Sequence, residues 1–239
     1  MNKFLIIVFG ILLLLTSGCA SLGKLGRHDF DSGFYRLKVP GTKPAHVYAE
    51  VAEDSVIVYP VSYDGNKEVP NTSTSIGTKI SRTKPDNYLY NSCFINNSLD
   101  IDLTSIIFKS RHSRDDVPNQ FSADLDIAIY MGIRKDLYKI VSPASPIHEQ
   151  KSFIRQVGFD LGIFAGIGSS PVNPTVTNNK ISQEYDAMIF QKGFAAFISI
   201  NKMSVGLAVG FDNLLDKSKS SWIYNQKPYL GLIISVSSF

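Results

Sequence analysis

The chain has 239 residues, of which 44% are hydrophobic and 19% charged, and its net charge is +3. This composition excludes a disordered chain, and so small a charge, evenly spread, excludes a nucleic-acid-binding surface. The 15 phenylalanines, 11 tyrosines and 17 glycines favour strands over helices. We therefore expect an all-β protein with enough residues for one barrel or two small domains.

Residues 1–18 have the pattern of a bacterial secretion leader. Lys3 supplies the basic region, and an apolar stretch runs from Phe4 to Leu15. A helix of that length spans only about 18 Å, whereas the hydrocarbon core of a bilayer is roughly 30 Å thick. The stretch is therefore expected to be a cleaved leader and not a membrane anchor.

The end of the leader resembles a lipobox, the cleavage motif of bacterial lipoproteins: Leu15-Thr16-Ser17-Gly18-Cys19. The resemblance implies that Cys19 becomes the first residue and carries a diacylglycerol thioether and an N-acyl chain, such as palmitate. Two or three acyl chains anchor a protein stably, at about 0.8 kcal/mol per buried CH₂. An ordinary signal peptide cleaved near Cys19 is the alternative. Ala20 stands where an Asp would retain a lipoprotein in the inner membrane, so we expect the outer membrane.

Three segments follow the leader. Residues 19–33 contain the lipidated cysteine and a tether, residues 34–87 a small β unit and a linker, and residues 88–239 an antiparallel β-barrel. The β unit contains three strand-like runs, at 34–39, 47–51 and 55–59.

The barrel segment alternates large apolar residues with small or polar ones. From Phe121 to Ile133 every second residue is apolar, and further such segments begin at Val157, Phe194, Met203 and Leu230. Leu99 to Leu103 alternates as well, and Ile106-Ile107-Phe108 follows after a slip of register. Only a strand separates these two sets of residues onto opposite faces.

The small and polar face fits the interior of a narrow barrel, and the apolar face would then contact lipid. We predict a small antiparallel up-and-down barrel of about eight strands, as is usual for bacterial membrane barrels. Six strands are clear after Leu99; residues 34–63 or 88–96, or other chains, would supply the rest. A soluble barrel on a lipid tether is the alternative. Aromatic residues near the strand ends predict interfacial girdles: Tyr88, Tyr90, Tyr130, Tyr138, Trp222, Tyr224 and Tyr229.

Charged residues on the inward face predict a polar network inside the barrel. Its expected members are Asp124, Asp126, Arg134, Asp160, Lys192 and Asp212. Buried charges must be paired, and narrow barrels are normally filled by side chains, so filling is preferred to a pore or ligand cavity.

No pattern in the sequence predicts catalysis, a metal site or a cofactor. The four histidines, His28, His46, His112 and His148, all lie outside the predicted barrel strands. There is no Gly-x-Ser-x-Gly motif and no zinc-ligand spacing. An envelope hydrolase that uses His112 or His148 is the weakest alternative.

Three groups of motifs lie between residues 95 and 239. They are Asp100-Ile101-Asp102-Leu103 with Phe108-Lys109; Gly166-Ile167-Gly168 with Asn173-Pro174, Val176 to Asn179, Glu184-Tyr185-Asp186 and Lys192-Gly193; and Val205 to Asp212 with Leu214-Leu215-Asp216, Trp222-Ile223-Tyr224 and Lys227 to Leu232. They resemble a family of uncharacterised outer-membrane lipoproteins of Gram-negative bacteria with a small C-terminal β-barrel. The resemblance implies the architecture and the outer membrane, and no activity.

These observations predict a non-enzymatic outer-membrane lipoprotein with a structural or interaction role in the cell envelope. Its partners would be membrane lipid, through Cys19 and the barrel exterior, and envelope proteins that the sequence does not identify. The alternative is a lipid-tethered periplasmic barrel that binds a small apolar ligand.

Overall fold

The computed structural model describes residues 29–52, 55–73, 80–81, 91–124, 126–141, 153–200 and 203–236. The predicted leader and Cys19 lie outside the described residues, as do His28 and His148. Strands make up most of the described chain, and its only helices are two short 3₁₀ turns, η1 (Thr175–Thr177) and η2 (Lys217–Ser220). No helix among the described residues is long and apolar enough to cross a membrane.

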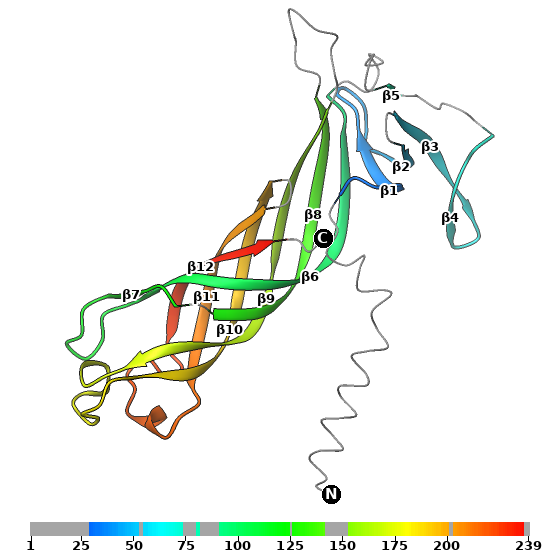
Figure 1. The fold of residues 1–239 in the computed structure, drawn as a ribbon. Coiled ribbons are helices and arrows are strands. Elements are labelled where there is room, and N and C mark those ends of the chain that lie inside the picture. The colour runs from blue at the N-terminus through cyan, green and yellow to red at the C-terminus, as the bar shows by residue number, and fades with distance from the viewer. Residues whose placement is uncertain are drawn as a thin grey trace, which may run out of the picture.

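Six long antiparallel strands form a closed ring (Figure 1). The ring runs in sequence order and closes where the last strand pairs with the first. Its members are β6 (Cys93–Arg111), β8 (Asp126–Val141), β9 (Phe153–Val172), β10 (Tyr185–Ile200), β11 (Met203–Leu214) and β12 (Pro228–Val236). The predicted all-β fold with a small antiparallel up-and-down barrel is therefore confirmed.

The ring closes with six strands and not with the about eight that we expected. Following the paired residues once around the ring from Ser98 leads back to β6 at Ile106, eight residues further on. Such a stagger tilts the strands strongly against the barrel axis. Glycines make the tight curvature possible: a Cβ added at Gly162 would overlap the Met131 carbonyl oxygen, and one at Gly166 the Ile127 carbonyl oxygen.

The N-terminal strands extend the same sheet beyond the ring. They are β1 (Gly33–Lys38), β2 (Ala45–Val51), β3 (Ser55–Asp64), β4 (Lys67–Pro70) and β5 (Ile80–Ser81). The three predicted strand-like runs are confirmed as β1, β2 and β3. β1 pairs with the first residues of β6, from Lys38 opposite Cys93 to Arg36 opposite Ile95. β6 therefore belongs to both the N-terminal unit and the barrel.

A hydrophobic core joins the N-terminal unit to the ends of β6 and β8 that project from the ring. Tyr35 of β1 packs against Phe94 of β6 and Tyr138 of β8, with each pair of ring centroids 5.9 Å apart. Phe30 lies against all three aromatic rings, at 5.0–5.1 Å. The unit and the barrel thus share buried side chains as well as backbone hydrogen bonds.

One irregularity interrupts β6, and it lies at Ile107 and not before Ile106, where the sequence pattern suggested a slip of register. Leu232 of β12 lies opposite Phe108, but the next residue, Ile233, lies opposite Ile106, so Ile107 is an extra residue on β6. Such a β-bulge reverses the alternation along its strand. Before the bulge even-numbered residues such as Asp102 are buried, and after it Lys109 and Arg111 are buried instead.

Candidate functional site

Every strand of the ring turns one set of side chains inward. On β8 the alternation is unbroken: Asp126, Tyr130 and Arg134 are buried, whereas Ile129 and Ile133 are exposed. The interior holds two groups of charged residues with an apolar section between them. The arrangement is that of a filled barrel with an apolar outside.

The first charged group, which we call the loop-end cluster, consists of Lys109, Arg111, Asp126 and Asp212. Lys109 Nζ lies 2.7 Å from Asp126 Oδ2 and 3.0 Å from Asp212 Oδ1, and Arg111 Nη2 lies 2.7 Å from Asp212 Oδ2. The Lys109 ammonium also lies 4.5 Å from the centre of the Tyr229 ring. Two cations and two carboxylates balance, so this buried cluster is formally neutral.

The second charged group, the terminus-end cluster, consists of Asp100, Asp102, Arg134, Asp136 and Asp160. Arg134 Nε lies 3.0 Å from both carboxylate oxygens of Asp136, and Nη1 lies 3.6 Å from Asp100 Oδ2. All five side chains are buried, and the cluster contains four carboxylates and one guanidinium. The terminus-end cluster is therefore rich in acid, unlike the loop-end cluster.

Neutral donors supply further hydrogen bonds to the terminus-end cluster. The Tyr130 hydroxyl donates to Asp160 Oδ1 at 2.5 Å, the Ser235 hydroxyl to Asp102 Oδ2 at 2.8 Å and the Gln156 amide to Asp136 Oδ1 at 3.2 Å. Hydrogen bonds to buried carboxylates reduce the free-energy cost of desolvating them.

Apolar side chains occupy the section between the two clusters. Tyr130 and Phe197 meet edge to face, with ring centroids 4.9 Å apart. The buried residues of this section are Ile106, Ala128, Tyr130, Phe164, Ala195, Phe197, Ala208, Tyr229 and Ile233. The described side chains thus fill the lumen there, as expected for so narrow a barrel.

The loops beyond β9 and β11 cover the loop end of the barrel. The Ile223 amide donates to the Val176 carbonyl at 3.0 Å, and both side chains are buried beside Trp222. Arg111 of the loop-end cluster lies 5.7 Å from the Trp222 ring centre. The loop of residues 173–184 therefore packs as a cap over the loop end of the barrel.

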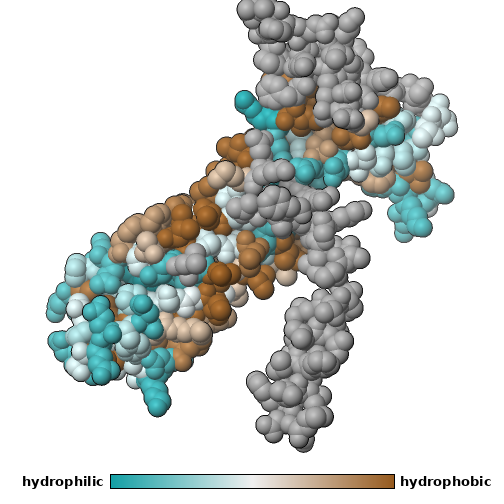
Figure 2. Space-filling view, viewed as in Figure 1, coloured by the Kyte–Doolittle hydropathy of each residue, from teal (hydrophilic) through white to brown (hydrophobic). Residues whose placement is uncertain are grey.

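Large apolar side chains dominate the outward face of the ring, and we call this surface the belt; Figure 2 shows the side of it that is in view. Each ring strand contributes at least one large apolar side chain that is between 52% and 74% exposed: Leu103, Ile133, Leu161, Phe194, Leu207 and Leu230. Figure 2 shows the apolar surface over the middle of the barrel and polar residues at its loop end. A water-soluble monomer rarely exposes so large an apolar surface.

The predicted aromatic girdles are wrong for the described tyrosines and for Trp222. Tyr130, Tyr138, Trp222, Tyr224 and Tyr229 are all buried. The physical reason is strand alternation: Tyr130, for instance, shares the inward face of β8 with Asp126 and Arg134. Tyr88 and Tyr90 lie outside the described residues.

The structure brings four of the predicted network residues into the barrel, but not as one group. Asp126 and Asp212 belong to the loop-end cluster, and Arg134 and Asp160 to the terminus-end cluster. Asp124 is half-buried in the connection that precedes β8.

The prediction that Lys192 points into the barrel is wrong. Lys192 is exposed on β10, between the buried Gln191 and the inward-facing Gly193. It has the same alternation as Phe194, which belongs to the belt. Counting by twos from Phe194 places Lys192 on the outside.

Sequence reasoning missed five of the buried charged residues. Asp100, Asp102 and Asp136 follow simple alternation with apolar neighbours and were within reach of that signal. Lys109 and Arg111 were not, because the bulge at Ile107 reverses their orientation.

The described histidines offer no catalytic arrangement. His46 lies on β2 of the N-terminal unit, 3.3 Å from Glu68 Oε1, and His112 is exposed in a loop. Among the described residues there is no group of three or more His, Cys, Asp or Glu side chains placed to hold a metal ion.

Comparisons with protein families, curated proteins and solved structures find no match to this chain.

Proposed function

We propose that the chain is an outer-membrane lipoprotein whose six-stranded barrel is embedded in the bilayer and serves a structural or interaction role without catalysis. The belt is the observation that carries the proposal, because all six strands of the ring contribute to it. Transferring a large apolar side chain from water to an apolar environment stabilises by about 1.5–3 kcal/mol. A bilayer would cover the belt on every side of the barrel.

The lengths of the ring strands support this placement. A tilted strand needs about 9–11 residues to cross the hydrocarbon core. The shortest ring strand, β12, has 9 residues, and the others have 12 to 20. The closed ring also leaves few backbone groups without partners, as a membrane-spanning structure requires.

The connections support one orientation. Residues 112–119, 173–184 and 215–227 are connections at the loop end; at the other end two residues separate β10 from β11, and residues 142–152, which lie outside the described residues, separate β8 from β9. In outer-membrane barrels the short turns face the periplasm and the long loops face outside. The N-terminal unit would then lie in the periplasm, on the side where an acylated Cys19 would enter the inner leaflet.

The alternative is a lipid-tethered periplasmic barrel that binds a small apolar ligand. Two features of the described residues disfavour it. The apolar section around Phe164 and Phe197 occupies the lumen, and the belt would face water. A ligand carrier of this class would show the reverse pattern, with an apolar cavity inside and a polar surface outside.

The proposal is tested by replacing residues 1–19 with a cleavable leader that lacks the lipidated cysteine. The embedded barrel predicts that the protein stays in the membrane fraction after extraction with alkaline carbonate. Release of the protein into the soluble periplasmic fraction would overturn the embedding and favour the alternative. Incorporation of labelled palmitate into the unaltered chain, and its loss in Cys19→Ala, tests the lipid anchor separately.

A further inference from the structure

A row of basic residues crosses four neighbouring strands where β6, β8 and β9 project beyond the ring. Lys38 of β1 pairs with Cys93 of β6, Cys93 with Lys139 of β8, and Lys139 with Arg155 of β9. Residues paired across antiparallel strands point to the same face of the sheet. The two lysines and Arg155 are exposed, so three cations lie on one surface.

Two more cations lie on the same face, between this row and the belt. Arg36 pairs with Ile95, and Lys135 pairs with Asn97 on one side and Phe159 on the other. Both side chains are exposed. We call the five residues Arg36, Lys38, Lys135, Lys139 and Arg155 the basic band.

The basic band begins where the belt ends. On β8 the outward residues from Ile127 to Ile133 are apolar, and the next two outward charged positions are Lys135 and Lys139. On β9, Phe159 precedes Arg155 in the same manner when the strand is followed away from the ring. Long basic side chains at the edge of an apolar surface reach the headgroup layer of a bilayer.

None of the five cations forms an ion pair with another described residue. The outward positions of β6, β8 and β9 beside them hold Cys93, Ile95, Leu137 and Val157, and no carboxylate. On the other side of β1, Glu68 lies 3.3 Å from His46, which pairs with Arg36, and it lines a second hollow with Arg36, so it offsets part of the charge at that end. The positive charge on β8 and β9, from Lys135, Lys139 and Arg155, has no described carboxylate beside it.

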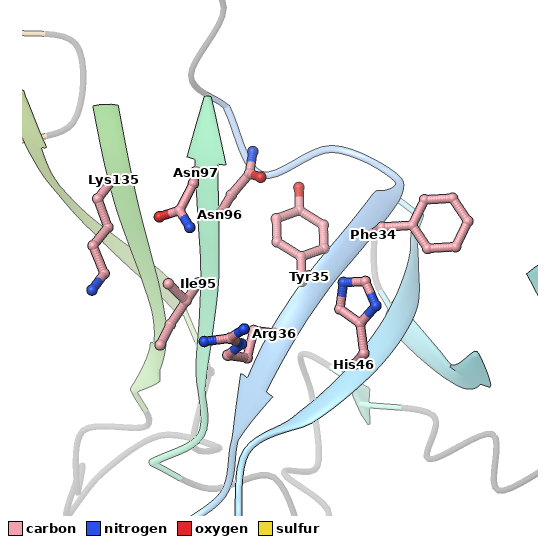
Figure 3. Close-up of a pocket in the computed structure, with 8 residues that line it drawn as sticks. All are labelled: Phe34, Tyr35, Arg36, His46, Ile95, Asn96, Asn97 and Lys135. Atoms are coloured by element: carbon pink, nitrogen blue, oxygen red, sulfur yellow. The ribbon is translucent and has the colours of Figure 1, made fainter. Parts of the chain in front are cut away.

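A hollow of about 240 Å³ opens beside Arg36 and Lys135 of the basic band. Figure 3 shows the side chains that line it. β1 and β6 are paired only as far as Arg36 and Ile95, and the two strands part beyond that point. Arg36, Lys135 and the amides of Asn96 and Asn97 line the hollow. Cations and neutral donors around one space suit a phosphate group.

We infer that the basic band binds the phosphate headgroups of anionic phospholipids in the leaflet next to the N-terminal unit. This inference rests on the proposed embedding, because the belt places the basic band at headgroup depth. It adds a lipid class to that proposal and names the residues that select it. Each basic side chain near an anionic surface strengthens association about fivefold.

The test uses the full chain in bilayer discs of phosphatidylethanolamine with a minor fraction of phosphatidylglycerol. The lipids that remain bound to the protein after mild detergent extraction are measured by mass spectrometry. The unaltered protein should be enriched in phosphatidylglycerol, and Arg36→Gln/Lys135→Gln/Lys139→Gln should lose most of that enrichment. The matched control Lys180→Gln/Lys219→Gln/Lys227→Gln removes three exposed cations from the loop end and should keep it.

Two further measurements make the outcome decisive. Lys135→Arg/Lys139→Arg preserves the charge and should preserve the enrichment, which a merely disturbed fold would not. Equal enrichment in phosphatidylglycerol for the basic-band variant and the control would overturn the inference. Complete displacement of the lipid by excess inorganic phosphate would also overturn it, because it would indicate a site for the free phosphate ion. Resistance to carbonate extraction is measured in parallel. A protein that resists extraction but shows no preference for phosphatidylglycerol refutes this inference alone. A protein that is extracted by carbonate refutes the proposed insertion of the barrel into the bilayer.

Discussion

Lys109 lies 2.7 Å from Asp126 inside the barrel, and the bulge at Ile107 makes this contact possible. If β6 continued through Ile107 in regular alternation, with no bulge, the pattern that buries Asp100 and Asp102 would turn Lys109 toward the outside. Asp126 would then be a buried carboxylate without its cation. The bulge at Ile107 therefore places Lys109 where it can pair with the buried Asp126.

Deleting Ile107 should be tolerated, whereas deleting Ile101 should not. Without Ile107, regular alternation still places Ile106, Lys109 and Arg111 inward, because the bulge alone is removed. Without Ile101, every residue on one side of the deletion changes face. Folded barrels migrate anomalously on gels unless they are heated, so this shift should persist in the first variant and vanish in the second. A folded Ile101 deletion beside an unfolded Ile107 deletion would contradict the assigned bulge.

The Lys109–Asp126 pair should show strong coupling in a double-mutant cycle. Lys109→Met leaves the two carboxylates of the loop-end cluster with Arg111 alone, and should destabilise the barrel by about 3–5 kcal/mol. Adding Asp126→Asn to Lys109→Met should recover part of that loss, because the uncompensated charge disappears. Urea unfolding in lipid vesicles measures both free energies of unfolding. Additivity within about 0.5 kcal/mol would mean that the two residues do not interact.

Gly162→Ala should destabilise the barrel by about 1–3 kcal/mol. The new methyl group would overlap the backbone of Met131 on the neighbouring strand, and the two strands must separate to admit it. Gly33→Ala is the matched control, because its methyl group would lie 3.7 Å from the Tyr35 ring, an ordinary contact. Equal unfolding midpoints for the two variants would show that the curvature does not depend on Gly162.

The N-terminal unit should lose stability at alkaline pH through Tyr35. Burial raises the pKa of Tyr35 to about 12, and its hydroxyl donates to the Asp31 carbonyl at 2.7 Å. The folded state therefore keeps a proton that the unfolded state releases near pH 10, so the stabilisation is complete below that pH and is lost as the pH rises toward 12. The expected loss is about 2–3 kcal/mol. Tyr35→Phe should flatten this part of the pH profile; an unchanged profile would place the titration elsewhere.

Strand alternation alone predicts the all-β class, the three N-terminal runs and the inward position of Asp126, Arg134, Asp160 and Asp212. The number of strands that close the barrel could not be predicted in this way. It depends on which strand pairs with β12 and on the sheet curvature that Gly162 and Gly166 permit. Local patterns carry no information on such long-range pairing.

The inward turn of Lys109 and Arg111 was also out of reach of the sequence pattern. A reader who counts by twos from Asp100 places both cations outside, because the bulge at Ile107 is decided by the pairing with β12. The error at Lys192 has another origin. The alternation of Lys192 with Phe194 along β10 predicts an outward side chain, so its true position was within reach of the sequence pattern.

The central claim, that the belt faces lipid, is tested most directly by spin labels placed one at a time along β8 in a Cys93→Ser background. Labels at Ile129, Met131 and Ile133 should be accessible to oxygen dissolved in the bilayer and protected from a water-soluble nickel relaxation agent. A label at Lys139, in the basic band, should show the reverse preference. Access of the nickel agent to positions 129, 131 and 133 equal to that at 139 would contradict the account.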